Sequence, residues 1–244
     1  MMTQLGRYLL IAVAVATLGA ARVQAVTTVV FYCGQSFQGH GVLAGDLDCT
    51  GFGGVGVTIV RGRLELNGFT IKNAAQFGIH CETTCVIIGP GTITGNGLDG
   101  LRTEGWARVS DTRIINNVND GINARNYSTA SRVVVTDSII TGNGFSGIEA
   151  DSSVILRRSI VSGNAENGID VGVYACDTTG RLVLFGSAVT NNGGHCTVSD
   201  ECADLSSCGR NSRAPKVKRE STCQTSHVRQ SGSPGQTWGV CTLD

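Results

Sequence analysis

Hydrophobic and polar residues alternate in short stretches along this chain, and the alternation recurs every 21 to 28 residues. In each repeat a hydrophobic anchor follows another small or apolar residue by two positions and precedes an isoleucine or valine by five. The anchors are Leu66, Ile88, Val109, Val135, Leu156 and Leu184, and the later positions are Ile71, Ile93, Ile114, Ile140, Val161 and Val189. Because side chains alternate across a β-strand, this two-residue period predicts strands rather than helices.

Asparagine and glycine recur in the turn that follows each of these stretches. Eight residues past the anchor stand Asn96, Asn117, Asn143, Asn164 and Asn192, while the first repeat has Ala74. Twelve residues past the anchor stand Gly78, Gly100, Gly121, Gly147 and Gly168, each followed by Ile or Leu. Short strands separated by such turns at a fixed period are typical of a solenoid in which every repeat is one coil.

The predicted fold is therefore all-β: a right-handed, single-stranded parallel β-helix of about six to seven coils with disulfide-rich caps. One coil is expected to contain strands over residues 108–110, 113–116 and 121–124. Stacking the coils should place the six anchors in one interior column. A leucine-rich repeat has a similar period, but it requires a Leu-x-x-Leu-x-Leu pattern and a helical half, neither of which occurs here.

The repeated polar turn residues are expected to serve the scaffold rather than catalysis. Stacked asparagine amides can hydrogen-bond to one another from coil to coil, and Ala74 should mark the end of that ladder. Each repeated glycine either adopts a positive φ or lets two backbones approach closely.

The two ends of the chain differ from the repeats. Residues 1–25 read as a secretory signal, with Arg7 in the basic region, an apolar stretch over 8–20 and a cleavage site near Ala25. That stretch is shorter than the ~20 residues of a membrane span, so no span is expected in the mature chain. We assign residues 26–55 to an N-terminal cap, 56–197 to the repeats and 198–244 to a cysteine-rich C-terminal cap or tail.

Composition agrees with export. Removing residues 1–25 takes away two of the 19 basic residues and none of the 19 acidic ones, which leaves a formal charge of −2 and gives no indication of nucleic acid as a partner. All ten cysteines lie beyond Ala25, an even number that favours disulfides in an oxidising compartment. Cys33 and Cys49 are able to close one loop. Cys81 and Cys85 resemble half of a metal site, but no second such pair with histidine follows.

One outward position recurs on the strand after each repeated glycine. It holds His80, Arg102, Asn123, Glu149 and Asp170, and the positions two residues further hold Glu82, Glu104, Arg125, Asp151 and Gly172. The candidate glycan-facing ladder drawn from these residues is Arg102, Arg125, Glu149, Asp151 and Asp170. Carboxylates on adjacent coils would lie ~5 Å apart, close to the separation of a retaining glycosidase pair. The acidic end could instead bind calcium, or the row could consist of ordinary polar residues on an exposed sheet with no function.

These features resemble a known group of proteins. The run Leu64-Glu65-Leu66-Asn67-Gly68 and the repeated Asn-x-x-x-Gly-Ile motif are similar to the right-handed parallel β-helix proteins of the pectin-lyase-like superfamily. The ending Trp238-Gly239-Val240-Cys241 resembles the tail of exported bacterial members. The resemblance implies action on acidic polysaccharides from the outer face of one parallel sheet. However, the chain lacks the paired Asp-Asp of galacturonases and a complete Arg-x-Pro-x-x-Arg.

We therefore expect an exported module that is structural or binds polysaccharide at or beyond the cell surface, with no cofactor. The alternative is a small polysaccharide lyase, epimerase or hydrolase that acts on acidic glycans through Glu149, Asp151 and Asp170 with Arg102 or Arg125. No catalytic motif decides between a binding module and an enzyme.

Overall fold

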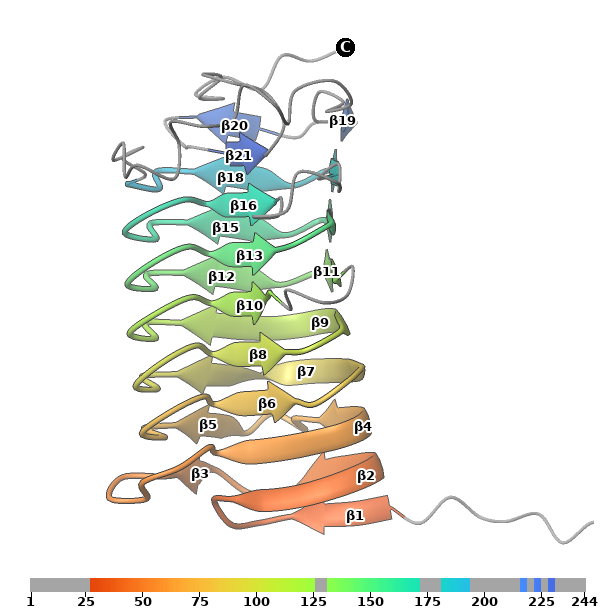
Figure 1. Ribbon diagram of the computed structural model, residues 1–244, viewed down its shortest axis with the longest axis vertical. Helices are drawn as coiled ribbons and strands as arrows, with labels where there is room; N and C mark the ends of the chain where they lie inside the picture. Colours follow the sequence, from red (N-terminus) through yellow and green to blue (C-terminus); the bar gives the residue numbers. More distant parts are fainter. Residues whose placement is uncertain are drawn as a thin grey trace, which may run out of the picture.

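The computed structural model describes residues 27–125, 131–171 and 181–193, together with three short strands between residues 216 and 230. The predicted signal over residues 1–25 lies outside the described residues, as do most of the predicted C-terminal tail and its cysteines. The described residues form a parallel β-solenoid of about six turns and contain no helix (Figure 1). No helix long and apolar enough to cross a membrane occurs in this part of the chain.

The strands stack on three faces of the coil, which we call faces A, B and C. Face A contains the strands that follow the repeated glycines: β6 (Ile79–Cys81), β8 (Leu101–Thr103), β10 (Ile122–Ala124), β13 (Ile148–Ala150), β16 (Ile169–Val171) and β21 (Val228–Gln230). Figure 1 shows these strands directly above one another.

Faces B and C carry the rest of each coil. Face B contains the first parts of β7 (Cys85–Thr94) and β9 (Trp106–Ile115), then β11 (Arg132–Thr136), β14 (Ser153–Arg157), β17 (Arg181–Phe185) and β19 (Lys216–Lys218). Face C contains β3 (Leu47–Asp48), β5 (Thr70–Lys72), the last parts of β7 and β9, then β12 (Ile139–Thr141), β15 (Ile160–Ser162), β18 (Ala188–Thr190) and β20 (Thr222–Gln224).

The N-terminal residues already belong to the stack. β1 (Thr27–Val30) pairs in parallel with β2 (Gln35–Leu43), and β2 pairs with β4 (Val57–Glu65), which turns from face A to face B along its length. The region assigned to the N-terminal cap thus contains stacked strands of its own.

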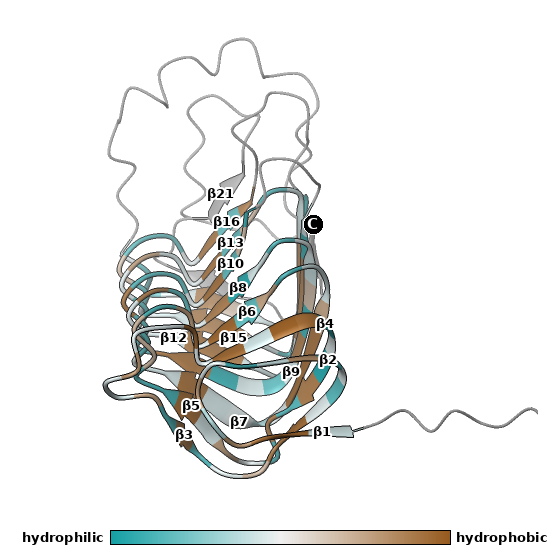
Figure 2. Ribbon diagram, turned by 60° about the horizontal axis from the view of Figure 1, so that its bottom comes forward, coloured by the Kyte–Doolittle hydropathy of each residue, from teal (hydrophilic) through white to brown (hydrophobic). Residues whose placement is uncertain are grey.

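Columns of like residues fill the interior, as the alternation predicted. Hydrophobic residues lie mainly on the strands (Figure 2), and their inward members are fully buried. On face A this column is Val57, Ile79, Leu101, Ile122, Ile148 and Ile169. On face C it is Ile71, Ile93, Ile114, Ile140, Val161 and Val189. In-register parallel pairing brings each residue against its counterpart in the next coil, ~4.8 Å away.

The predicted anchor column on face B was wrong in its first two members. Ile88 is only half-buried, and Leu66 is buried but lies outside the column, which runs through Leu64, Ile87, Val109, Val135, Leu156 and Leu184. The corner between faces B and C shortens from six residues after Leu64 to five after Ile87 and four after Val109. Counting back a fixed five positions from face C therefore misplaced the inward residue wherever the corner is longer.

The asparagines form the predicted ladder, and it runs in one direction. Each Asn Nδ2 donates to the Oδ1 of the asparagine one coil further, at 2.8 to 2.9 Å from Asn96 to Asn192. The same Oδ1 also accepts the backbone N–H of the preceding coil's asparagine. Ala74 ends the ladder, since its N–H donates to Asn96 Oδ1 at 3.1 Å.

The repeated glycines permit a close approach and do not require a positive φ. A Cβ on Gly121 would lie 2.6 Å from the carbonyl oxygen of Gly147 and 2.8 Å from Asn143 Nδ2. The left-handed conformation falls on the residue directly before each ladder position, as at Asn73, Gly95, Asn116, Gly142, Gly163 and Asn191. The glycine and the asparagine are therefore one structural unit, because the amide lies where a side chain on the glycine would be.

A second ladder, which the repeat pattern did not reveal, lies at the corner between faces B and C. The hydroxyls of Ser138, Ser159 and Ser187 each accept the backbone N–H of the equivalent residue one coil earlier, at 3.1 to 3.2 Å. Each of these hydroxyls donates to the carbonyl oxygen two residues before it. All three serines are buried, so the ladder pairs backbone groups that would otherwise lack partners.

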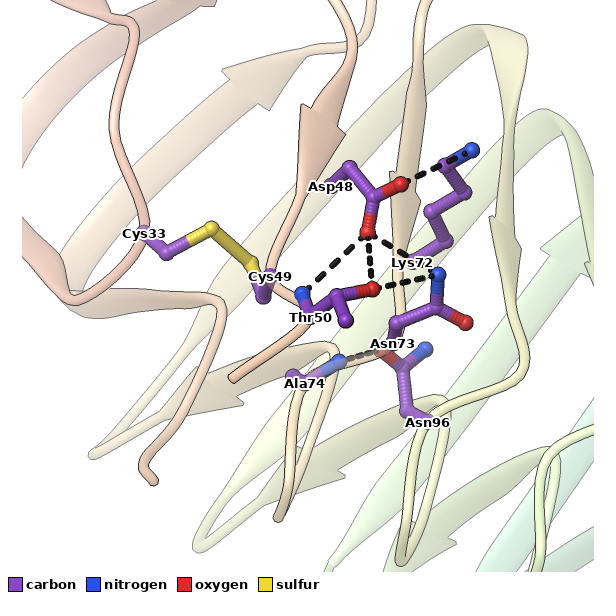
Figure 3. Close-up of a disulfide and its surroundings, with 8 residues drawn as sticks. All are labelled: Cys33, Asp48, Cys49, Thr50, Lys72, Asn73, Ala74 and Asn96. Atoms are coloured by element: carbon purple, nitrogen blue, oxygen red, sulfur yellow. Dashed lines mark hydrogen bonds and ion pairs between the residues drawn. A yellow bond between two sulfur atoms is a disulfide. The ribbon is translucent and has the colours of Figure 1, made fainter. Parts of the chain in front are cut away.

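Two disulfides crosslink the first coils, as the cysteine spacing suggested for Cys33 and Cys49. That bond joins the chain before β2 to the end of β3 (Figure 3). Beside it, hydrogen bonds from Thr50 and Asn73 hold the pKa of the Asp48 carboxyl well below its usual range, and Lys72 Nζ lies 3.2 Å from Asp48 Oδ2. Cys81 and Cys85 are bonded to each other, which rules them out as zinc ligands in this state.

The glycine–asparagine unit predicts a large effect of one methyl group. Gly121→Ala should destabilise the protein by about 1–3 kcal/mol, because its Cβ meets backbone and the Asn143 amide rather than a flexible side chain. Gly53→Ala is the matched control, since a Cβ there has nothing within 4 Å. Chemical denaturation of the two variants measures the difference, and equal midpoints would contradict the close approach.

The direction of the asparagine ladder predicts unequal costs for its members. Asn143→Ala removes the acceptor of two buried donors, the N–H and Nδ2 of Asn117, whereas Asn96→Ala removes the acceptor of the Ala74 N–H only. A buried donor left unpaired costs about 1–3 kcal/mol, so the Asn143 variant should lose roughly twice as much stability. Thermal unfolding of both variants tests this, and identical losses would rule out the ladder as drawn.

Candidate functional site

The outward residues of face A form a continuous row, one per coil. Register pairs His80 with Arg102, Arg102 with Asn123, Asn123 with Glu149, and Glu149 with Asp170. Since the strands are ~4.8 Å apart, the row presents a polar side chain at regular intervals along the solenoid axis. We call His80, Arg102, Asn123, Glu149 and Asp170 the face A row.

The structure places four of the five predicted ladder residues together and excludes the fifth. Arg102, Arg125, Glu149 and Asp170 lie in contact on or beside face A. Asp151 does not join them: only 2% of it is exposed, and its backbone N–H donates to Ser131 Oγ at 2.9 Å. The prediction assumed that the alternation continues past Ala150, but β13 ends there and Asp151 belongs to the following corner. Gly172 lies outside the described residues.

Two carboxylates that the sequence analysis missed lie beside the row. Asp99 and Asp120 immediately precede the repeated Gly100 and Gly121, and both are buried. Asp99 Oδ1 accepts the N–H of Asp120 at 3.2 Å, and Asp120 Oδ1 accepts the N–H of Ser146 at 2.8 Å. The repeated Asp-Gly pair was the available signal for this third ladder.

Arg125 connects the C-terminal half of the row. Its Nη1 lies 2.7 Å from Glu149 Oε1 and its Nη2 lies 3.2 Å from Asp170 Oδ2, so one guanidinium bridges two adjacent coils. Its backbone N–H donates to Asn123 Oδ1 at 3.1 Å. Because the Arg125 side chain is only 15% exposed, these ion pairs are screened less than surface pairs.

Arg102 has a similar role one coil earlier and is more exposed. Its Nη2 donates to the carbonyl oxygen of Arg125 at 3.2 Å. Its other nitrogens lie 3.8 Å from Asp99 Oδ2 and 3.7 Å from Glu104 Oε1. His80 Nε2 lies 3.6 Å from the same Glu104 oxygen, which extends the network to β6.

Asn123, Asp120 and Glu149 form the most buried part of this network. Asn123 Nδ2 donates to Asp120 Oδ2 and to Glu149 Oε2, both at 2.7 Å. The carboxyl groups of Asp120 and Glu149 thus share one amide donor. Two carboxylates this close to each other favour the retention of a proton on one of them. We call Asp99, Arg102, Asp120, Asn123, Arg125, Glu149 and Asp170 the carboxylate–arginine cluster.

Burial changes the acidity of this cluster. Burial and then the charge of Asp120 raise the pKa of Glu149 to about 8, despite the opposing effect of Arg125. Burial and then the charge of Asp99 raise the pKa of Asp120 to about 6, and burial raises that of Asp99 to about 6. Perturbed carboxyl groups gathered on one face are typical of functional sites, although structural networks perturb pKa values too.

The arrangement suits hydrogen bonding better than metal binding. Among the described residues, no group of three or more His, Cys, Asp and Glu side chains is placed to hold a metal ion. At the acidic end, where calcium was considered, the guanidinium of Arg125 lies between Glu149 and Asp170. A protonated carboxyl beside ionised ones can donate as well as accept protons, as general acid–base chemistry requires.

Comparison with known proteins identifies the fold. The family model described as right handed beta helix region matches residues 53–208. No curated protein and no solved structure matches the chain significantly.

The raised pKa values predict that stability falls as pH rises. A carboxyl whose pKa is higher in the folded than in the unfolded state binds its proton more tightly when folded, so its contribution is present below pH ~4 and is lost through pH 8. Between pH 5 and 8 the loss should be on the order of 1–3 kcal/mol in the wild type. Glu149→Gln, which has nearly the same size but does not titrate, should flatten that dependence.

Urea denaturation at several pH values provides the measurement. Glu166→Gln is the control, because Glu166 is an exposed carboxyl in a turn outside the cluster. The same slope of stability against pH in the wild type and in Glu149→Gln would contradict the raised pKa of Glu149.

Proposed function

Since the chain belongs to the right handed beta helix family, we propose that it is an exported module that binds polysaccharide along face A, at or beyond the cell surface. The observation that supports this most is the face A row, with one polar side chain per coil in strict register. Export is supported by the signal-like residues 1–25 and by the disulfides Cys33–Cys49 and Cys81–Cys85, which form in oxidising compartments.

The row suits an extended polymer that lies parallel to the solenoid axis. Polar side chains repeat every ~4.8 Å, so successive coils offer similar contacts to successive parts of a repeating ligand. The exposed fraction of the side chains is highest at the N-terminal end of the row, 26% for His80 and 23% for Arg102. It is 15% for Glu149 and 10% for Asp170, and Asn123 between the two ends is buried. The most accessible contacts therefore come from the N-terminal half, together with Glu104, which is 39% exposed.

Affinity would come from several weak contacts together. A single exposed polar or charged contact contributes below ~1 kcal/mol, whereas linked contacts add their effects through a high effective concentration. A short oligosaccharide should thus bind much more weakly than a long one.

A second function, polysaccharide cleavage or epimerisation, is favoured by the Asp120–Glu149 pair. Glu149 has a pKa of about 8 and would be largely protonated at neutral pH, while Asp170 is a second carboxyl on the adjacent strand. A proton donor and a carboxylate base on neighbouring coils are the groups that hydrolysis or lyase chemistry needs. Release of reducing ends or unsaturated products that disappears in Glu149→Gln would support it.

The binding function predicts a specific loss of affinity. The variant His80→Ala/Arg102→Ala/Glu104→Ala should lower affinity for a bound polysaccharide by at least about tenfold, because it removes the accessible contacts of three polar groups. A glycan array identifies the polysaccharide, and affinity electrophoresis in gels containing it measures the change.

The control is Asp137→Ala/Arg158→Ala, which removes an exposed ion pair at the corner between faces B and C. It should leave binding unchanged. Equal binding by the wild type and the face A variant would move the site away from the row, and absence of binding to every glycan would favour a purely structural role.

A further inference from the structure

The two guanidinium groups on or beside face A both have partners within the protein. Arg125 uses Nη1 and Nη2 on Glu149 and Asp170, while Arg102 donates to the carbonyl oxygen of Arg125 and lies 3.8 Å and 3.7 Å from the carboxylates of Asp99 and Glu104. An arginine binds an external carboxylate or sulfate best through two parallel hydrogen bonds from its fork. An anionic ligand at either arginine would therefore compete with the carboxylates that already neutralise it.

The charge around the row is negative. On or beside face A, the described residues include six carboxyl groups and only two guanidinium groups; the carboxyl groups are Glu82, Asp99, Glu104, Asp120, Glu149 and Asp170. With Glu149 protonated, since its pKa is raised to about 8, five carboxylates still accompany two guanidinium groups.

From these two observations we infer that the face A row selects glycans without anionic groups and excludes uronate and sulfated polymers. This rests on the proposed binding function and specifies its ligand class. A carboxylate on the ligand would face a negative surface and would compete with an internal ion pair. A sugar hydroxyl group meets neither obstacle. Each side-chain carboxylate oxygen has lone pairs beyond those used internally, so it can accept hydrogen bonds from sugar hydroxyls.

The selectivity should be strongest where the row is most accessible. Glu104 is 39% exposed and Glu82 is exposed, and they directly follow the adjacent strands β8 and β6. They would meet an approaching polymer before the buried part of the cluster does. Their charges act within the ~10 Å Debye length of dilute buffers, so selectivity should decrease as salt rises.

The test compares polymers that differ only in charge. Polygalacturonate is paired with its fully methyl-esterified form, and carboxymethyl cellulose with hydroxyethyl cellulose, and binding of the wild-type protein to each is measured at pH 7 in low and high salt. The neutral member of a pair should bind at least about tenfold more tightly in low salt, a difference of ~1.4 kcal/mol. Tighter binding of the anionic member would overturn the inference.

A variant tests the cause of the selectivity. Glu82→Gln/Glu104→Gln removes two accessible charges without changing side-chain size and frees the Nε of Arg102. It should raise the ratio of anionic-polymer affinity to neutral-polymer affinity severalfold. The control Glu65→Gln/Asp111→Asn makes the same change in net charge away from face A and should leave the preference unaltered.

The outcomes separate the inference from the proposed function. Binding of anionic polymers alone, abolished in the face A variant, would keep the binding function and refute the ligand class. Equal changes in the test and control variants would assign the preference to net charge rather than to the row and so refute the inference. Failure of every polymer and every glycan on the array to bind would refute both.

Discussion

The constraint on which this structure depends is the in-register parallel pairing of successive coils. Once one coil is aligned with the next, every residue has its own counterpart as a neighbour ~4.8 Å away. The interior therefore consists of columns such as Ile79, Leu101 and Ile122, in which similar side chains pack on similar side chains. The same constraint acts on polar residues, so a polar side chain that enters the interior must find its hydrogen-bond partners in its own coil or in the adjacent ones.

Three polar ladders show how the sequence meets that requirement. Asparagine carries both a donor and an acceptor, so a column from Asn96 to Asn192 is self-complementary and also pairs the turn backbone. Serine does the same at another corner with a single hydroxyl, which accepts a backbone N–H of the preceding coil and donates to a carbonyl oxygen of its own coil. Carboxylates are the costly case: Asp99 and Asp120 accept backbone N–H groups, but burial raises the pKa values of both, and the charge of Asp99 raises that of Asp120 further.

The carboxylate–arginine cluster, in which these buried carboxyl groups lie, is the candidate site. Stacking places Glu149 and Asp170 on adjacent strands, where two carboxylates would repel, and Arg125 reaches from the preceding coil to pair with both. Protonation of Glu149, whose pKa is raised to about 8, lowers the remaining repulsion. A group that changes protonation near neutral pH couples the stability of this face to the pH of its surroundings. Because internal carboxylates already pair with its arginines, this face is also less attractive to anionic ligands than its basic residues suggest.

The sequence alone determined the fold, because the repeat encodes it locally. The two-residue alternation, the asparagine column ending at Ala74 and the glycine before each inward Ile were all visible without coordinates, and the Cys33–Cys49 pairing was anticipated. The face A row was also predictable, since outward positions follow from alternation within a strand. The six-turn solenoid of the right handed beta helix family confirms these predictions.

Tertiary structure alone decided the features that depend on corners and on contacts between coils. Corner length varies in the first coils, so the inward residue of face B is Ile87 and not Ile88. A strand end cannot be read from alternation, which is why Asp151 was assigned outward although it is buried. The pairing of Arg125 with Glu149 and Asp170 joins residues 24 and 45 positions apart, and the partners of a long side chain are set by which coil it reaches. Local sequence fixes the direction of a side chain on its strand, but its electrostatic environment is a sum over neighbours that only the stacked structure brings together.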